Sequence, residues 1–190
     1  KSGTITIENT KIISGGTKPA VYSYEDSKTN IIDSTIQGEK TVISVLKNSQ
    51  VNITNSNVKI GNTSGETGIK NTNGKVNITN SEITIIDAST NGIGIHSNTQ
   101  NAVTTITNST VTANKNAISN EKGTLIINSG TFTSNSQHAV RTTENTTING
   151  GTFISNTMAG LQILETGNNI VLNEGVFKTK SNTIGGIAIP

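Results

Sequence analysis

Acidic side chains recur at a nearly regular spacing in the second half of the sequence. Glu121, Glu144 and Glu165 are separated by 23 and 21 residues, with Lys122 and Arg141 nearby. If the chain coils so that these carboxylates stack about 5 Å apart, they could bind Ca²⁺ or orient a sugar hydroxyl. The alternative is a solvated edge whose charges are balanced by the two cations. No motif in the sequence requires a cofactor, so none is predicted. Bound Ca²⁺ at these glutamates is the one possibility that the sequence leaves open.

Aromatic residues are only 3% of the sequence, yet two of them stand close together as Tyr22 and Tyr24. Alternate residues of a strand point to the same side, so the two rings could form a small stacking patch for sugar. Lys70 and Arg141 occupy the equivalent place in later repeats. We therefore predict Tyr22, Tyr24, Lys70 and Arg141 as ligand-binding residues. The alternative is that the tyrosines cover the first repeat as part of a cap.

The elements that must position these residues are copies of one unit, which is clearest in residues 51–60, VNITNSNVKI. Apolar residues alternate on each side of Asn55-Ser56, as they do in a short strand with one buried face. The alternation is broken across that pair, and Asn tolerates the left-handed backbone region better than most residues. The unit is therefore a strand, a two-residue bend and a second strand.

The bend recurs along the whole sequence at intervals of 21 to 28 residues, which indicates a repeat architecture. The bend pairs are Asn9-Thr10, Asp33-Ser34, Asn55-Ser56, Asn80-Ser81, Asn108-Ser109, Ser129-Gly130, Gly150-Gly151 and Glu174-Gly175. A third strand is expected between bends, where a small residue usually precedes Ile, Val or Leu. These pairs are Ala20-Val21, Val42-Ile43, Gly68-Ile69, Gly92-Ile93, Ala117-Ile118, Ala139-Val140, Gly160-Leu161 and Gly186-Ile187.

Three short strands in each repeat leave no room for a helix. Chains of this kind coil into a parallel β-helix, in which each turn stacks on the last at about 4.8 Å. We predict an all-β fold, a right-handed parallel β-helix of about eight turns, as a single domain over residues 1–190. Columns of Ile, Val, Leu and Phe would fill the interior, and the bend column would be in part a ladder of Asn side chains.

The I-x-N-S-x-V bend and the strand with Gly or Ala before Ile resemble repeats of right-handed parallel β-helices of the pectin-lyase-like superfamily. The amino-acid composition, without Cys and rich in Asn, Thr, Ser and Ile, is similar to that of bacterial surface proteins, including Gram-positive adhesins and autotransporter passengers. The resemblance covers essentially the whole chain. It implies a secreted protein that binds carbohydrate or host surfaces, or in some members cleaves polysaccharide.

The residues expected to point outward after the third strand's apolar position argue against catalysis. They are Tyr22, Ser44, Lys70, Gly94, Ser119, Arg141, Gln162 and Ala188. None of them is acidic, whereas the enzymes that the chain resembles use clustered Asp or Glu on such a face. We therefore predict that the chain is not an enzyme. His96 and His138 stand at different offsets from their strands and are expected to be ordinary surface histidines, not a metal pair.

The composition excludes two classes of partner. A net charge of +2 with 14% charged residues gives no field that would attract nucleic acid. No run of 18 apolar residues is present, so no membrane insertion is expected.

The loops in which ligand binding is most readily expected are Gly61–Thr67 and Ser97–Val103, which are among the longest.

The sequence is best interpreted as a segment of a larger bacterial surface protein, extracellular or secreted. Its predicted role is non-catalytic binding or presentation, with a glycan or a host surface as ligand and neighbouring domains of the same protein as further partners. Two alternatives remain open. One is a carbohydrate-active enzyme of the same fold, a polysaccharide lyase or glycoside hydrolase, and the other is a passive structural stalk.

Overall fold

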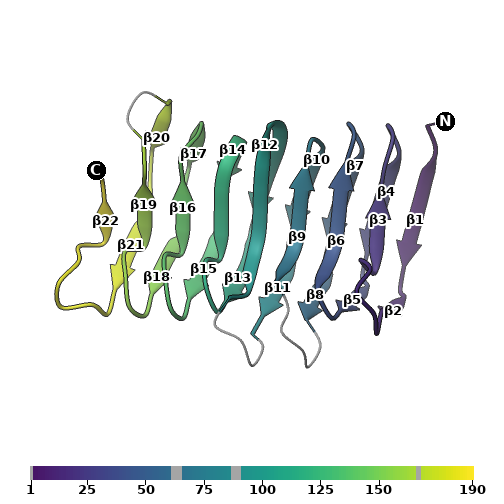
Figure 1. Cartoon of the computed structure of the whole chain (residues 1–190), viewed down its shortest axis with the longest axis horizontal. Coiled ribbons are helices and arrows are strands. Elements are labelled where there is room, and N and C mark those ends of the chain that lie inside the picture. The colour runs from purple at the N-terminus through teal and green to yellow at the C-terminus, as the bar shows by residue number, and fades with distance from the viewer. Residues whose placement is uncertain (1, 61–65, 87–90, 166–167) are drawn as a thin grey trace.

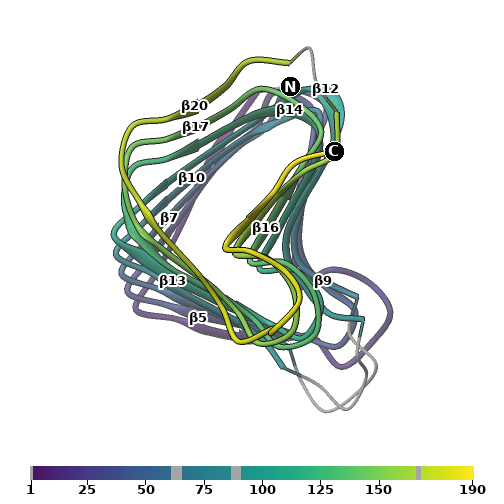
Figure 2. The ribbon, with the colours of Figure 1, turned by 90° about the vertical axis from the view of Figure 1, so that its left-hand side faces the viewer.

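The computed structural model describes residues 2–60, 66–86, 91–165 and 168–190, which form strands and turns but no helix. The chain coils into a rod with its two termini at opposite ends (Figure 1). Seen from the C-terminal end, the chain turns counterclockwise as it advances toward the viewer (Figure 2). The coil is therefore a right-handed parallel β-helix, as the repeat pattern predicts.

One sheet contains the strands that follow the bend, and its eight strands pair in parallel in chain order. They are β2 (Lys11–Ile13), β5 (Thr35–Gly38), β8 (Asn57–Ile60), β11 (Glu82–Ile85), β13 (Ser109–Ala113), β15 (Gly130–Ser134), β18 (Thr152–Ser155) and β21 (Val176–Thr179). Seven full turns separate the first of these strands from the last, which is close to the eight turns predicted.

The other sheet has 14 strands and contains both the strands before the bend and the third strands. The strands before the bend are β1 (Thr4–Glu8), β4 (Lys28–Ile32), β7 (Gln50–Thr54), β10 (Lys75–Thr79), β17 (Thr146–Ile148) and β20 (Ile170–Leu172). The third strands are β3 (Val21–Ser23), β6 (Thr41–Leu46), β9 (Thr67–Thr72), β16 (Val140–Thr142), β19 (Leu161–Ile163) and β22 (Ile187–Ala188).

Two long strands join these sets, because β12 (Ile93–Thr107) and β14 (Ile118–Ile127) each run from the third strand into the strand before the next bend. The expected loop Ser97–Val103 is therefore wrong, because those residues belong to β12. Ser97, Asn98 and Val103 pair with β14, with a register shift after Ser97 and another after Asn98. Residues 61–65 of the other expected loop, Gly61–Thr67, lie outside the described residues.

The interior consists of stacked columns of like side chains, as predicted. The column before the bend contains Ile7, Ile31, Ile53, Ile78, Ile106, Ile127, Ile148 and Leu172. The column after the bend contains Ile12, Ile36, Val58, Ile83, Val111, Phe132, Phe153 and Phe177. Away from the two ends these side chains are fully buried, and each contributes about 1.5–3 kcal/mol by its removal from water.

The bends have the backbone conformation that the sequence predicts. The first bend residue has φ between 47° and 49° in Asn9, Asp33, Asn55, Asn80 and Asn108. In the last three bends the second residue is a Gly with positive φ. Asn, Asp and Gly are the residue types that adopt positive φ with the least steric strain.

Side-chain ladders hold successive bends together. The amide of Ser56 donates to Ser81 Oγ at 3.1 Å, the amide of Ser34 donates to Ser56 Oγ at 3.0 Å, and both hydroxyls are buried. The predicted Asn ladder is present in part, since Asn108 Nδ2 donates to Asn80 Oδ1 at 2.8 Å. The serine ladder satisfies backbone groups that the bend removes from the sheet, which the sequence pattern alone did not reveal.

Candidate functional site

The outward side chains of the third strands form one line along the rod. Strand pairing places them in the order Tyr22, Ser44, Lys70, His96, Ser119, Arg141, Gln162 and Ala188. The prediction is correct except that His96 occupies the place expected for Gly94. The cause is a shift of two residues, because Ile95 and not Ile93 pairs with Ile69 and Ile118.

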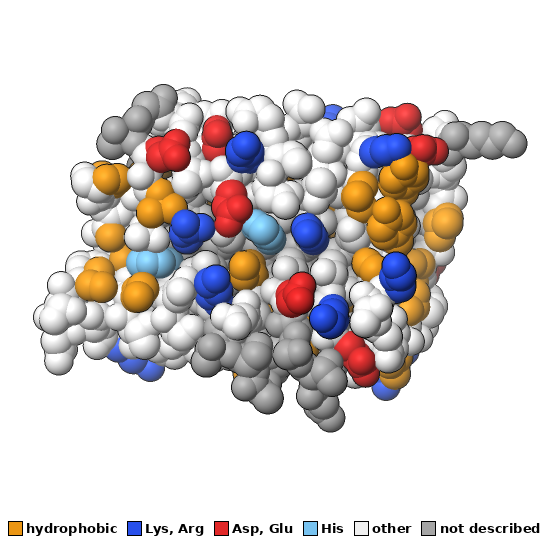
Figure 3. All heavy atoms as spheres, in the orientation of Figure 1, with side chains coloured by type: hydrophobic (Ala, Val, Ile, Leu, Met, Phe, Trp, Pro, Cys, Tyr) orange, Lys and Arg blue, Asp and Glu red, His pale blue; other side chains and the backbone are white. Residues whose placement is uncertain are grey.

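An exposed aromatic cluster stands at the N-terminal end of this line, where Figure 3 shows hydrophobic side chains gathered on the surface. Tyr22 is 57% exposed, and its ring stacks on Tyr24 with centroids 5.8 Å apart. Lys47 Nζ lies 4.6 Å from the centre of the Tyr24 ring and 3.6 Å from Glu25 Oε1. The structure thus offers two adjacent ring faces flanked by a cation, an arrangement suited to stacking.

The cation beside the tyrosine rings is Lys47, which the sequence analysis did not name, and the ligand-binding role of Lys70 stays a prediction. Lys70 lies on the same outward line, two turns beyond Tyr22. The pKa of Lys47 is raised, chiefly by the Tyr24 side chain and also by the Glu25 carboxylate. Sequence reasoning missed Lys47 because it follows its strand in a turn. The sequence signal that could have revealed it is Asn48, because Asn is common where the backbone turns with positive φ. Both Lys47 and Asn48 have positive φ in the structure, as the bends do.

A charged group lies in the middle of the line. Glu121 Oε1 is 3.4 Å from a guanidinium nitrogen of Arg141, and Glu121 Oε2 is 3.3 Å from His96 Nε2, although without the geometry of a hydrogen bond. Ser119 lies between His96 and Arg141 in the sheet, is 1% exposed, and its hydroxyl has no hydrogen-bond partner. This serine is therefore not connected to the imidazole as an activated nucleophile would be.

Two of the three glutamates of the predicted calcium site differ in their contacts, and the third, Glu165, is exposed. Glu121 pairs with Arg141, whereas the backbone of Glu144 lies in a turn held by the hydroxyls of Thr142 and Thr146. Within the described part of the chain, no three His, Cys, Asp or Glu side chains converge as metal ligands would. The calcium site at these three glutamates stays a prediction. The candidate site with the most described contacts is the hollow beside Arg141.

A hollow of about 450 Å³ lies beside the C-terminal half of the line. There the chain bends inward ahead of β16 (Figure 2). Its lining residues are Lys115, Asn116, Gln137, His138, Arg141, Met158, Gln162 and Leu164. The hollow joins two cations and three amides to a thioether and an aliphatic side chain, so it suits a polar ligand with an apolar face.

His138 is buried, being 6% exposed, so its prediction as a surface histidine is wrong. Its backbone amide donates to Asn116 Oδ1 at 3.1 Å, while its Nδ1 atom has no hydrogen-bond partner. Burial lowers the pKa of His138, Arg141 lowers it further, and the carbonyl of Ala159 acts in the opposite direction. The imidazole is therefore neutral at pH 7.

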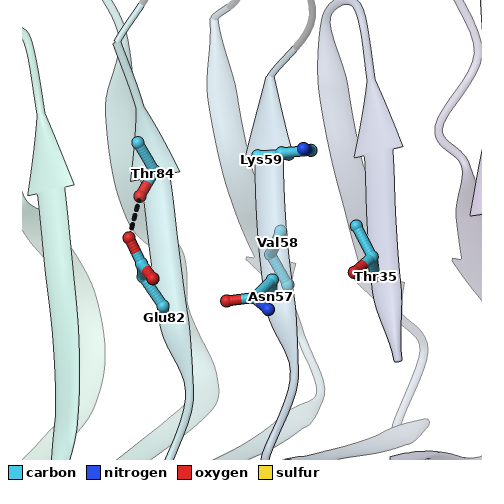
Figure 4. Close-up of a pocket in the computed structure, with 6 residues that line it drawn as sticks. All are labelled: Thr35, Asn57, Val58, Lys59, Glu82 and Thr84. Carbon is cyan, nitrogen blue, oxygen red and sulfur yellow. Dashed lines mark hydrogen bonds between the residues drawn. The ribbon is translucent and has the colours of Figure 1, made fainter. Parts of the chain in front are cut away.

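A second hollow, of about 350 Å³, lies on the outer face of the sheet after the bend and is lined by Thr35, Asn57, Val58, Lys59, Glu82 and Thr84 (Figure 4). Glu82 accepts a hydrogen bond of 2.9 Å from the Thr84 hydroxyl, and Lys59 points away from it (Figure 4). Its charges are mixed, and no aromatic ring is among its lining residues. We therefore regard it as the weaker candidate.

Among the described residues there is no helix with the length and apolar character that a membrane span requires. Comparisons of the chain with protein-family models, with curated protein sequences and with solved structures gave no match.

Proposed function

We propose that this chain is a non-catalytic glycan-binding module of an extracellular bacterial surface protein, with the third-strand face as its binding surface. The observation that carries the proposal is the exposed stack of Tyr22 on Tyr24, which begins a straight line of polar side chains. Sugars bind through ring stacking combined with several hydrogen bonds, and this face provides both.

The dimensions of the line favour an extended ligand. From Tyr22 to Gln162 the line crosses six steps between turns, or about 29 Å at a rise of roughly 4.8 Å per turn. Lys70 and Arg141 project from it at intermediate steps. A linear oligosaccharide lying along the rod could therefore contact the polar side chains of the line that reach solvent, but not Ser44 or Ser119, which are buried.

The two alternatives are weaker on this geometry. A lyase or glycoside hydrolase needs paired carboxylates near the ligand, whereas the Glu121 carboxylate, which lies beside His96 of the line, is engaged by Arg141. A passive stalk would use the ladders of the bends but would have no need for exposed tyrosines. Extracellular location rests on the resemblance to bacterial surface repeats. We further propose neighbouring domains as partners for the end turns, where Ile5 and Ile187 are 64% and 38% exposed.

The test is binding of the purified chain to a panel of neutral and acidic oligosaccharides, followed by affinity measurements on each ligand that binds. Replacing Tyr22 with Ala should weaken binding about two- to tenfold, the range expected for the loss of one ring contact. Thr84→Ala, on the opposite sheet, is the matched control and should bind normally. A panel without any bound glycan would contradict the proposal and favour the stalk.

A further inference from the structure

The hollow beside β16 and β19 has a marked charge asymmetry. Lys115 and Arg141 contribute two positive charges, and none of its lining residues is acidic. The Glu121 carboxylate contacts one nitrogen of the Arg141 guanidinium at 3.4 Å. A guanidinium has five N–H donors, so this contact leaves Arg141 with donors for a second acceptor.

The neutral lining residues complete a recognisable donor set. Gln137 and Gln162 carry amide groups, and Asn116 is fixed by accepting the backbone N–H of His138. Met158 and Leu164 form the apolar part of the wall. Amides and an apolar wall match the hydroxyls and the C–H face of a pyranose ring, whereas the two cations match an anionic substituent.

A buried group in the wall also points to a ligand. His138 is more than nine-tenths buried, and its Nδ1 atom is without a hydrogen-bond partner. Buried polar atoms normally have partners, and exceptions are concentrated where a water molecule or a ligand completes the structure. The residue with this unpaired Nδ1 atom therefore lines the same hollow as the two cations.

We propose that this hollow is a receptor for a sugar carboxylate, with Arg141 and Lys115 binding the carboxylate and Gln162 binding a neighbouring hydroxyl. The inference rests on the proposed glycan-binding function and narrows it to acidic glycans, those containing uronic or sialic acid. The hollow lies about five turns from the tyrosines, roughly 24 Å along the rod. The tyrosines and the hollow would therefore bind different sugar units of one ligand.

The experiment compares three ligands by calorimetry: an oligosaccharide of uronic acids, the same oligosaccharide with its carboxyl groups methyl-esterified, and a sialylated oligosaccharide. Esterification removes the charge while keeping the ring and its hydroxyls. The free acid should bind at least about tenfold more tightly than the ester, since hydrogen bonds to charged groups are the stronger ones. Comparison with the sialylated ligand identifies which acidic sugar is preferred.

The variants locate the site. Arg141→Gln should lower affinity for the acid by roughly tenfold or more and leave affinity for the ester nearly unchanged. Lys115→Gln should give a smaller loss, because a single ammonium binds as a point charge. Lys59→Gln is the matched control, since it removes one positive charge from the opposite sheet. Thermal unfolding of each variant verifies that the fold is retained.

The outcomes separate the two proposals. Equal binding of acid and ester, unaffected by Arg141→Gln, would overturn the carboxylate receptor and leave glycan binding intact. Binding of the acid that is lost equally in Arg141→Gln and Lys59→Gln would also overturn it, because general charge attraction would then explain the preference. Absence of binding to all three ligands would overturn the receptor, whereas binding of other, neutral glycans would keep the broader proposal.

Discussion

The ring of Phe153 lies over Gly151, the second residue of the preceding bend. A Cβ atom at Gly151 would lie 3.3 Å from Phe153 Cζ and 3.1 Å from the carbonyl oxygen of Gly130. The rings stack from turn to turn, with the Phe153 centroid 5.1 Å from Phe132 and 4.8 Å from Phe177. Bends with Asn or Asp first are followed by Ile or Val, because the larger ring fits only where the second bend residue is Gly.

Gly151→Ala should therefore destabilise the fold by about 1–3 kcal/mol. The substitution brings a methyl group into contact with Phe153 and forces a φ of 124°, a region that L-residues rarely adopt. Denaturant unfolding followed by circular dichroism measures the difference. The matched control is Gly16→Ala, where an added Cβ has no heavy atom within 4 Å, and its effect should stay below about 0.5 kcal/mol. Equal effects at the two glycines would show that the ring and the bend are independent.

Removal of one rung of the serine ladder should be comparably severe. In Ser81→Ala, the amide of Ser56 loses its acceptor, and a buried N–H without a partner costs about 1–3 kcal/mol. Thr84→Ala is the control, because that hydroxyl bonds the exposed carboxylate of Glu82. Equilibrium unfolding in urea gives both values. A loss no larger than the control's would mean that water replaces the serine hydroxyl at the bend.

The sequence was sufficient for the architecture because the fold depends on local alternation. Strand pairing confirms the aromatic and aliphatic column from Ile12 to Phe177 without exception. A third inner column begins at Ile5, two residues before the Ile7 column, and includes Val51, Val76, Leu125 and Ile170. It could be read from the sequence only in part, because Thr29, Thr104 and Thr146 fill its other positions. The sequence pattern does not distinguish a buried threonine from an exposed one. These three positions could therefore be assigned to the interior only from their pairing with neighbouring turns.

The site was harder to predict, because it depends on register and on burial between turns. His96 was missed since Gly92-Ile93 and Gly94-Ile95 are equivalent as patterns, and only pairing with Ile69 distinguishes them. His138 stands in a turn, and its burial follows from the inward bend of the chain ahead of β16 (Figure 2). Tyr22, Tyr24 and Arg141 could be named from the sequence because unusual side chains near repeated positions are visible in it, and their binding role stays a prediction.

Calcium should leave the stability unchanged. Glu121 is engaged by Arg141, and the described residues contain no convergent group of three acidic or imidazole ligands. We therefore expect the same Tm with millimolar Ca²⁺ as with chelator in a calorimetric scan. Mass action requires a ligand that binds only the folded state to raise Tm. A rise that disappears in Glu121→Gln would support the predicted site at Glu121, Glu144 and Glu165.

Acid should destabilise the protein through His138. The unfolded imidazole titrates near 6.5, while burial lowers the folded pKa, so between the two values the unfolded state binds more protons. The stabilising difference is fully present above about pH 7 and is lost as pH falls through 6.5 toward the folded pKa. Below that pKa both states are protonated and the loss from this group stops increasing.

The measurement is the free energy of unfolding of the native chain and of His138→Gln at half-unit steps from pH 7.5 to pH 4.5. Carboxylates titrate alike in both proteins, so their contributions cancel in the difference. The native chain should lose more stability than the variant below pH 6.5, because the variant has no imidazole to protonate. If the two curves run parallel, the imidazole titrates equally in both states, and the hollow is open enough to solvate its charge. The carboxylate receptor would then lose the buried polar wall that distinguishes it from an ordinary basic surface.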